Sequence, residues 1–72
     1  MGEVTREDLE AMHAEVDAGE RSEGGGLPYN LDDSLKQARI SRRVGLSPER
    51  WAEARAVPVE YARMLWRYLD QG

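Results

Sequence analysis

The residues of this chain best suited to chemistry form a basic cluster in its middle. Lys36, Arg39, Arg42 and Arg43 fall within eight residues. Four more arginines follow before the C-terminus, namely Arg50, Arg55, Arg63 and Arg67. A guanidinium group offers a planar set of donors that matches a carboxylate or a phosphate, and it stacks on aromatic rings. The cluster indicates either a binding surface for an acidic partner or a solvated helical face paired with neighbouring glutamates.

Other polar residues give little support for catalysis. His13 is the only histidine, and it lies in an N-terminal segment that we expect to be mobile, whereas a general base must be held close to its partner. Asp32 and Asp33 are adjacent, so they point to different sides of a helix. Glu49 and Glu53 lie one turn apart without an evident third ligand. We therefore expect no enzyme, no catalytic residue, no metal and no cofactor.

Length and composition indicate one small domain in a reducing compartment. The chain has 72 residues, a net charge of −4 and no cysteine. No apolar run approaches the roughly 18 residues of a membrane helix, and the acidic N-terminus does not resemble a signal peptide. We expect a cytoplasmic protein. Its charge is uneven, since residues 1–27 carry eight acidic and two basic residues, whereas residues 28–72 carry six and eight.

The first 26 residues are predicted to form a flexible acidic arm. Thr5 and Asp8 are spaced almost as in a capping box, but Leu9, Met12 and Val16 make only a thin apolar stripe. This pattern predicts a frayed helix that orders on a partner, or a solvated acidic tail. Residues 19–26, GERSEGGG, then read as a glycine-rich linker.

Residues 27–72 are predicted to form a small helical domain. Asn30 is a plausible N-cap, and Leu31, Leu35 and Ala38 share one helical face. Residues 40–44 fit either a continued helix or a short extended segment, and Gly45 ends either element.

Two further helices are expected after this glycine. Ser47-Pro48 is a strong helix start, and that helix should run through Val57 before the break imposed by Pro58. Apolar residues between Pro58 and Leu69 then recur at helical spacing, so the last helix should hold the core together. The predicted fold is mainly α, a three-helix domain over about residues 28–72.

The aromatic residues could serve either the core or an interface. Two Trp and three Tyr occur without Phe, and Trp51 and Trp66 should both reach the shared core. Trp, Tyr and Arg are also enriched in interface hot spots. The predicted partner-binding residues are Lys36, Arg39, Arg42, Arg43, Arg50, Trp51 and Arg55.

One family resemblance concerns DNA binding. The run ARISRRVGL followed by two helical segments is similar to the strand–helix–helix order of ribbon-helix-helix repressors, which act as dimers. This sequence departs from them because only Val57-Pro58 is available between the helices. A helix-turn-helix is likewise possible, but this sequence has no turn glycine between the last two predicted helices. The net negative charge also disfavours DNA, so a dimeric repressor or antitoxin is the alternative.

A second resemblance is to small bacteriophage-encoded inhibitors of host RNA polymerase, of the Xanthomonas-phage type. The segments ISRRVGLSPERWAEAR and EYARMLWRYL carry it. The resemblance implies a monomeric transcription regulator in the cytoplasm of the bacterial host. It would bind the β′ subunit of RNA polymerase, displace sigma, block initiation and suppress termination. The resemblance includes no diagnostic motif, so it assigns no function to any individual residue of this sequence.

Overall fold

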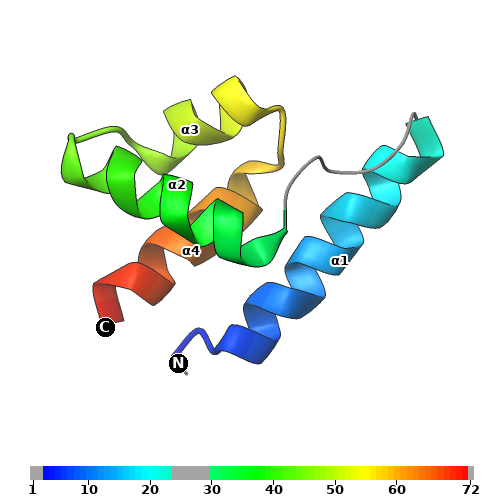
Figure 1. Cartoon of the computed structure of the whole chain (residues 1–72), viewed down its shortest axis with the longest axis horizontal. Coiled ribbons are helices and arrows are strands. Elements are labelled where there is room, and N and C mark those ends of the chain that lie inside the picture. Colours follow the sequence, from blue (N-terminus) through cyan, green and yellow to red (C-terminus); the bar gives the residue numbers. More distant parts are fainter. Residues whose placement is uncertain (1–2, 24–29, 72) are drawn as a thin grey trace.

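The computed structural model describes residues 3–23 and 30–71, which form four helices (Figure 1). They are α1 (Arg6–Glu23), α2 (Leu31–Arg43), α3 (Pro48–Arg55) and α4 (Val59–Gln71). Throughout these ranges there is no strand, so the expectation of a mainly α protein is confirmed. The described chain has four helices rather than three, because the N-terminal segment also folds as one.

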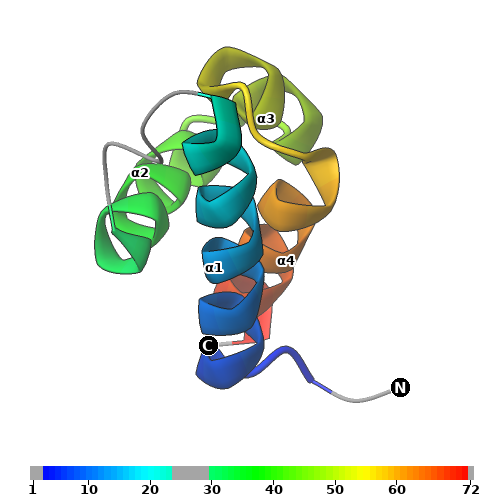
Figure 2. The same ribbon diagram turned by 90° about the vertical axis from the view of Figure 1, so that its right-hand side faces the viewer.

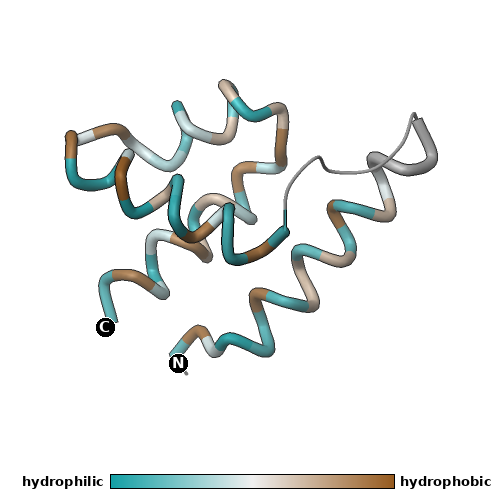
Figure 3. The backbone as a smooth tube through the Cα atoms, viewed as in Figure 1, coloured by the Kyte–Doolittle hydropathy of each residue, from teal (hydrophilic) through white to brown (hydrophobic). Residues whose placement is uncertain are grey.

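The C-terminal helix α4 is the centre of the fold and contacts α1, α2 and α3 (Figures 1 and 2). Its side chains Tyr61, Ala62 and Leu65 are fully buried. Apolar positions recur among hydrophilic ones along each helix, as an amphipathic helix on a shared core requires (Figure 3). The sequence-based expectation that this helix holds the core together agrees with the packing.

Helix α1 differs from the frayed helix expected of the N-terminal segment. Leu9 is fully buried and Val16 is only 7% exposed, so the thin apolar stripe is covered by the rest of the domain. His13 is half-buried, and its Nδ1 lies 2.7 Å from the hydroxyl oxygen of Tyr61 in α4. Three apolar residues cannot hold an isolated helix, but they suffice when another helix provides the opposing surface.

Part of the predicted glycine-rich linker is helical. Residues 19–23 belong to α1, and residues 24–26 lie outside the described part of the chain. The predicted boundary between arm and domain, at residues 26 and 27, falls there as well.

Helices α1, α2 and α3 each begin directly after a capping residue that the sequence analysis identified. The backbone N–H of Asp8 donates to Thr5 Oγ1 at 3.1 Å, and the Thr5 N–H donates to the Asp8 carboxylate at 3.0 Å. This reciprocal pair caps α1, and the backbone hydrogen bond from Thr5, followed by the side-chain one, lowers the pKa of Asp8. Asn30 and Ser47 cap α2 and α3 by accepting the N–H three residues on, at 2.9 and 3.2 Å.

Of the two alternatives for residues 40–44, the continued helix is correct and the extended segment is not, because α2 continues to Arg43. In a continued helix, Arg42 falls on the apolar face. In the structure the core ends before this turn, and the Arg42 guanidinium pairs with Asp70 at the end of α4. Gly45 then adopts a φ of +88°, and the Leu46 N–H donates to the Ser41 carbonyl at 2.9 Å. The helix ends in a Schellman motif, as glycine there predicts.

Helix α3 ends at Arg55, two residues earlier than expected. It also ends in a Schellman motif, although no glycine is present. Ala56 adopts the left-handed conformation, with φ 57° and ψ 42°. The Val57 N–H donates to the Ala52 carbonyl at 3.0 Å, and Val57 is buried beside it. Pro58 precedes α4 rather than forming its first residue, since the helix begins at Val59.

Replacing Ala56 with glycine should stabilise the protein. Glycine carries no Cβ penalty at positive φ, so Ala56→Gly should raise the free energy of unfolding by about 0.5–1 kcal/mol, measured by urea denaturation. Ala54→Gly is the matched control in the exposed interior of α3, and it should lower stability by about the same amount. Equal losses in both variants would contradict the left-handed conformation of Ala56.

Truncating Leu9 tests whether α1 belongs to the core. Leu9→Ala should lower the free energy of unfolding by about 2–4 kcal/mol, because a fully buried side chain is removed. If that variant does not fold, Leu9→Val should still cost about 1 kcal/mol. Glu10→Ala, on the exposed side of α1, should change stability by less than about 0.5 kcal/mol. A Leu9 effect as small as the Glu10 effect would mean that the segment is solvated.

Candidate functional site

The structure divides the seven predicted partner-binding residues among three places. Three arginines of α2, Arg39, Arg42 and Arg43, line one open groove. Lys36 lies with Trp51 and Arg55 at a smaller pocket between α2 and α3. Arg50 borders a third depression, with Leu46, Glu53 and Ala54. The predicted set therefore borders three different depressions.

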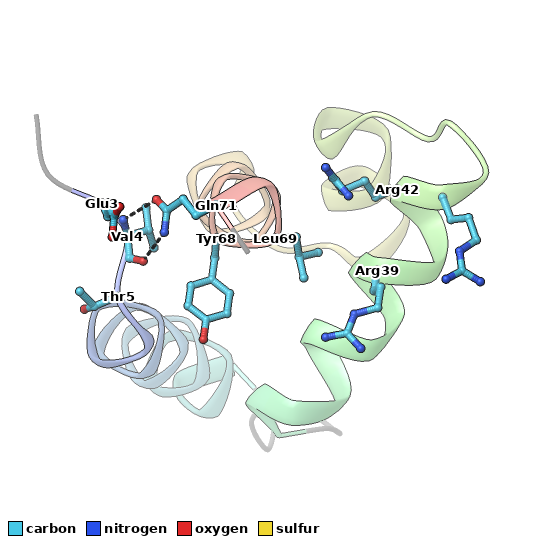
Figure 4. A pocket seen from close by; sticks show the side chains of 9 residues that line it. Glu3, Val4, Thr5, Arg39, Arg42, Tyr68, Leu69 and Gln71 are labelled. Carbon is cyan, nitrogen blue, oxygen red and sulfur yellow. Dashed lines mark hydrogen bonds between the residues drawn. The ribbon is translucent and has the colours of Figure 1, made fainter.

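The groove lies between the C-terminal half of α2, the end of α4 and the segment before α1 (Figure 4). It has a volume of about 820 Å³ and is lined by Glu3, Val4, Thr5, Arg39, Arg42, Arg43, Tyr68, Leu69 and Gln71. Two hydrogen bonds close one end, from the Val4 N–H to Gln71 Oε1 at 2.7 Å and from Gln71 Nε2 to the Val4 carbonyl at 2.8 Å. The groove thus places arginines beside the half-buried Tyr68 and Leu69.

The arginines of the groove have different surroundings. Arg42 pairs with Asp70, and both side chains remain partly exposed. Arg39 and Arg43 are exposed on α2. Arg42 and Arg43 also lie in the last turn of α2, where a cation offsets the negative end of the helix dipole. A local structural role therefore accounts for part of this cluster.

The sequence analysis placed Trp51 both in the shared core and among the partner-binding residues, and the structure buries its side chain, which is only 2% exposed. Its ring centroid lies 5.8 Å from that of Trp66 and 6.5 Å from that of Tyr61. The contact with Trp66 confirms that both tryptophans reach one core. The Arg55 guanidinium carbon lies 5.8 Å from the Trp51 ring centroid, at the distance of a cation–π contact.

Two apolar residues that the sequence analysis did not select are exposed, Ile40 on α2 and Val44 at its C-cap. Ile40 is 53% exposed and Val44 is 75% exposed, whereas the other large hydrophobic side chains in the described part of the chain are buried or half-buried. In a helix, Ile40 lies on the side opposite Leu31, Leu35 and Ala38, so a helical interpretation of residues 40–44 would have revealed it. Together with Lys36, Arg39 and Arg43, they define the α2 outer surface.

Two residues that line the pocket between α2 and α3 each carry a buried polar atom with no hydrogen-bond partner. These atoms are Ser34 Oγ and Trp51 Nε1. Ser34 is 1% exposed. The charged and polar residues around them are Asp33, Lys36, Gln37 and Arg55. Arg55 Nη2 donates to Gln37 Oε1 at 3.0 Å across the pocket.

Other ion pairs lie away from these sites. Arg63 of α4 donates to Glu49 of α3 at 3.0 Å, and the pKa of Glu49 is lowered by its own backbone N–H and then by Arg63. Arg6 of α1 pairs with Asp32 of α2, and that hydrogen bond raises the pKa of Arg6. These pairs join neighbouring helices at the surface.

Comparisons with known proteins give no relative: no protein-family model, curated protein or solved structure matches the chain. Within residues 3–23 and 30–71, no helix is long and apolar enough to cross a membrane. The same part of the chain contains no group of three or more His, Cys, Asp or Glu side chains placed to hold a metal ion.

Removing the Ser34 hydroxyl should stabilise the protein. A buried hydroxyl without a partner costs about 1–3 kcal/mol, so Ser34→Ala should raise the free energy of unfolding by about 1–2 kcal/mol. Ser41→Ala in the same helix is the control for helix propensity, with a gain of about 0.5 kcal/mol or less. Chemical denaturation measures both. A loss of stability in Ser34→Ala would contradict the unpartnered state of this hydroxyl.

Proposed function

We propose that this chain is a small, non-enzymatic transcription regulator that binds a partner protein through the α2 outer surface. The proposed partner is the β′ subunit of RNA polymerase in the cytoplasm of a bacterial host. Binding as a monomer would displace sigma, block initiation and suppress termination, as in the phage-encoded inhibitors that the sequence resembles.

One observation supports the proposed binding: arginines and exposed apolar side chains occur together on the α2 outer surface. Ile40 and Val44 are exposed beside Arg39 and Arg43. Exposed apolar groups flanked by arginine are typical of the centre of a protein interface, where apolar contacts supply affinity and charges supply orientation. The partner specified by this chemistry has an acidic surface with an apolar centre.

The charge of α1 supports the same interpretation. This helix contains seven acidic and two basic residues, whereas α2 contains two acidic and four basic ones. An acidic partner would be repelled by α1 and attracted to α2, so the uneven charge would orient the encounter. RNA polymerase is taken from the resemblance and is the part of the proposal that binding measurements must test.

Binding of purified bacterial RNA polymerase core enzyme to the immobilised full chain tests the surface and the partner together. A triple variant, Arg39→Ala with Ile40→Ala and Arg43→Ala, should weaken binding at least about a hundredfold, since each truncation in an interface centre costs about 1 kcal/mol or more. Arg67→Ala removes an exposed arginine of α4 outside the groove and should bind like the natural sequence.

The outcomes separate the two parts of the proposal. Unchanged binding by the triple variant would show that another surface is used. Absence of any polymerase binding would remove this partner. In that case, capture from nuclease-treated bacterial lysate, identified by mass spectrometry, would show whether another acidic protein occupies the α2 outer surface.

DNA binding is a second candidate, favoured by the connection between α2 and α3. Four residues, Val44 to Ser47, join these helices, and Gly45 holds positive φ in that turn, as in many helix-turn-helix motifs. Residues 38–43 are helical, which argues against the ribbon-helix-helix version, because its strand would lie there. Helix α3 carries two acidic and two basic residues, which provides little attraction for phosphate. Tight duplex binding with a steep salt dependence would favour this candidate over the polymerase.

A further inference from the structure

The pocket between α2 and α3 has features that packing alone does not explain. Its volume is about 250 Å³, smaller than the roughly 300–1,000 Å³ of sites for whole small molecules. It is of a size to take one side chain rather than a cofactor. Helices α2 and α3 form its two walls and contact each other directly.

The buried groups of this pocket are hydrogen-bond donors without an acceptor. The Trp51 indole N–H can only donate, and the Ser34 hydroxyl can donate or accept. Neither atom has a partner, although Trp51 is 2% and Ser34 is 1% exposed. Buried polar groups are almost always paired in folded proteins, so two unpaired groups at one pocket indicate a ligand that accepts hydrogen bonds.

The charges at the rim select the type of acceptor. Lys36 and Arg55 are positive and Asp33 is negative, which leaves one net positive charge among the lining residues. A carboxylate carries one negative charge and two acceptor oxygens, so it matches both the charge and the donors. A phosphate dianion carries twice the negative charge and would exceed the net positive charge of the lining.

We infer that this pocket receives the carboxylate of an aspartate or glutamate side chain from the partner protein. This inference rests on the proposed function, because it takes the partner to be a protein with an acidic surface. Lys36 belongs to the pocket and also to the α2 outer surface, so one partner segment can cover both. The bound carboxylate accepts from Ser34 and Trp51, while Arg55 and Lys36 neutralise its charge.

Nuclear magnetic resonance of the full ¹⁵N-labelled chain tests this inference without the partner. The probe is N-acetylglutamate N-methylamide, and the control probe is the corresponding glutamine derivative. The observed signal is the Trp51 indole N–H, identified by comparison with Trp66→Phe. The glutamate probe should shift this signal saturably, and the glutamine probe should not.

Variants assign the binding to the pocket. Ser34→Ala and Arg55→Gln should each weaken binding of the glutamate probe at least about tenfold, because each loses a hydrogen bond or an ion pair to a charged group. Arg50→Gln is the matched control outside the pocket and should bind equally well. The glutamate probe should also raise the melting temperature of the natural sequence more than that of Ser34→Ala.

Three results would overturn the inference: no saturable shift of the Trp51 signal, an equal shift with the glutamine probe, or equal binding of inorganic phosphate. Failure of the polymerase experiment leaves this measurement unaffected, since the probe needs no partner. Conversely, polymerase binding without any response of the Trp51 signal to the probe would uphold the proposed function and reject the pocket.

Discussion

The fold depends on the burial of Tyr61 in the middle of α4. This side chain is fully buried, lies against the Trp51 ring of α3 and has its hydroxyl oxygen 2.7 Å from His13 of α1. One aromatic residue therefore joins three of the helices through apolar contact and through a polar contact at its tip. Tyrosine suits this position because its ring buries a large area while its hydroxyl still needs a partner. A small chain gains much of its stability from a few such contacts, since it buries a smaller fraction of its surface than a large one.

This core also explains where the functional candidates lie. The buried face of α2 ends at Ala38, so the last turn of the helix extends beyond the core. Arg42 can then reach Asp70 at the end of α4, and Ile40 remains on the outer side with Arg39 and Arg43. The same helix meets α3 closer to its N-terminus, where Ser34 and Trp51 approach the pocket. Helix α2 thus contributes both to the pocket, through its N-terminal half, and to the α2 outer surface, through its C-terminal half.

The two features differ in their physical cost. The α2 outer surface exposes apolar and charged groups to water, which costs the folded state little because such groups are also hydrated in the unfolded chain. The pocket instead keeps two donors away from water without acceptors, which destabilises the folded state. The helix dipole and the Arg42–Asp70 pair account for part of the surface arginines of α2, but no such role accounts for the unpaired donors. For this reason the pocket is the more specific indication of a ligand.

The sequence by itself determined the local features of this protein, namely the helical class, the caps at Thr5, Asn30 and Ser47, and the end of α2 at Gly45. Each depends on hydrogen bonds between residues only a few positions apart, so a short pattern specifies it. Only the tertiary structure decided that α1 docks, because its thin stripe around Leu9 is stable only when it packs against the other helices, chiefly α4 and also α2. It likewise decided that α2 continues to Arg43 and that the basic residues border three different depressions. These outcomes depend on contacts between distant segments, and no local pattern in this chain encodes which side chains those segments will cover.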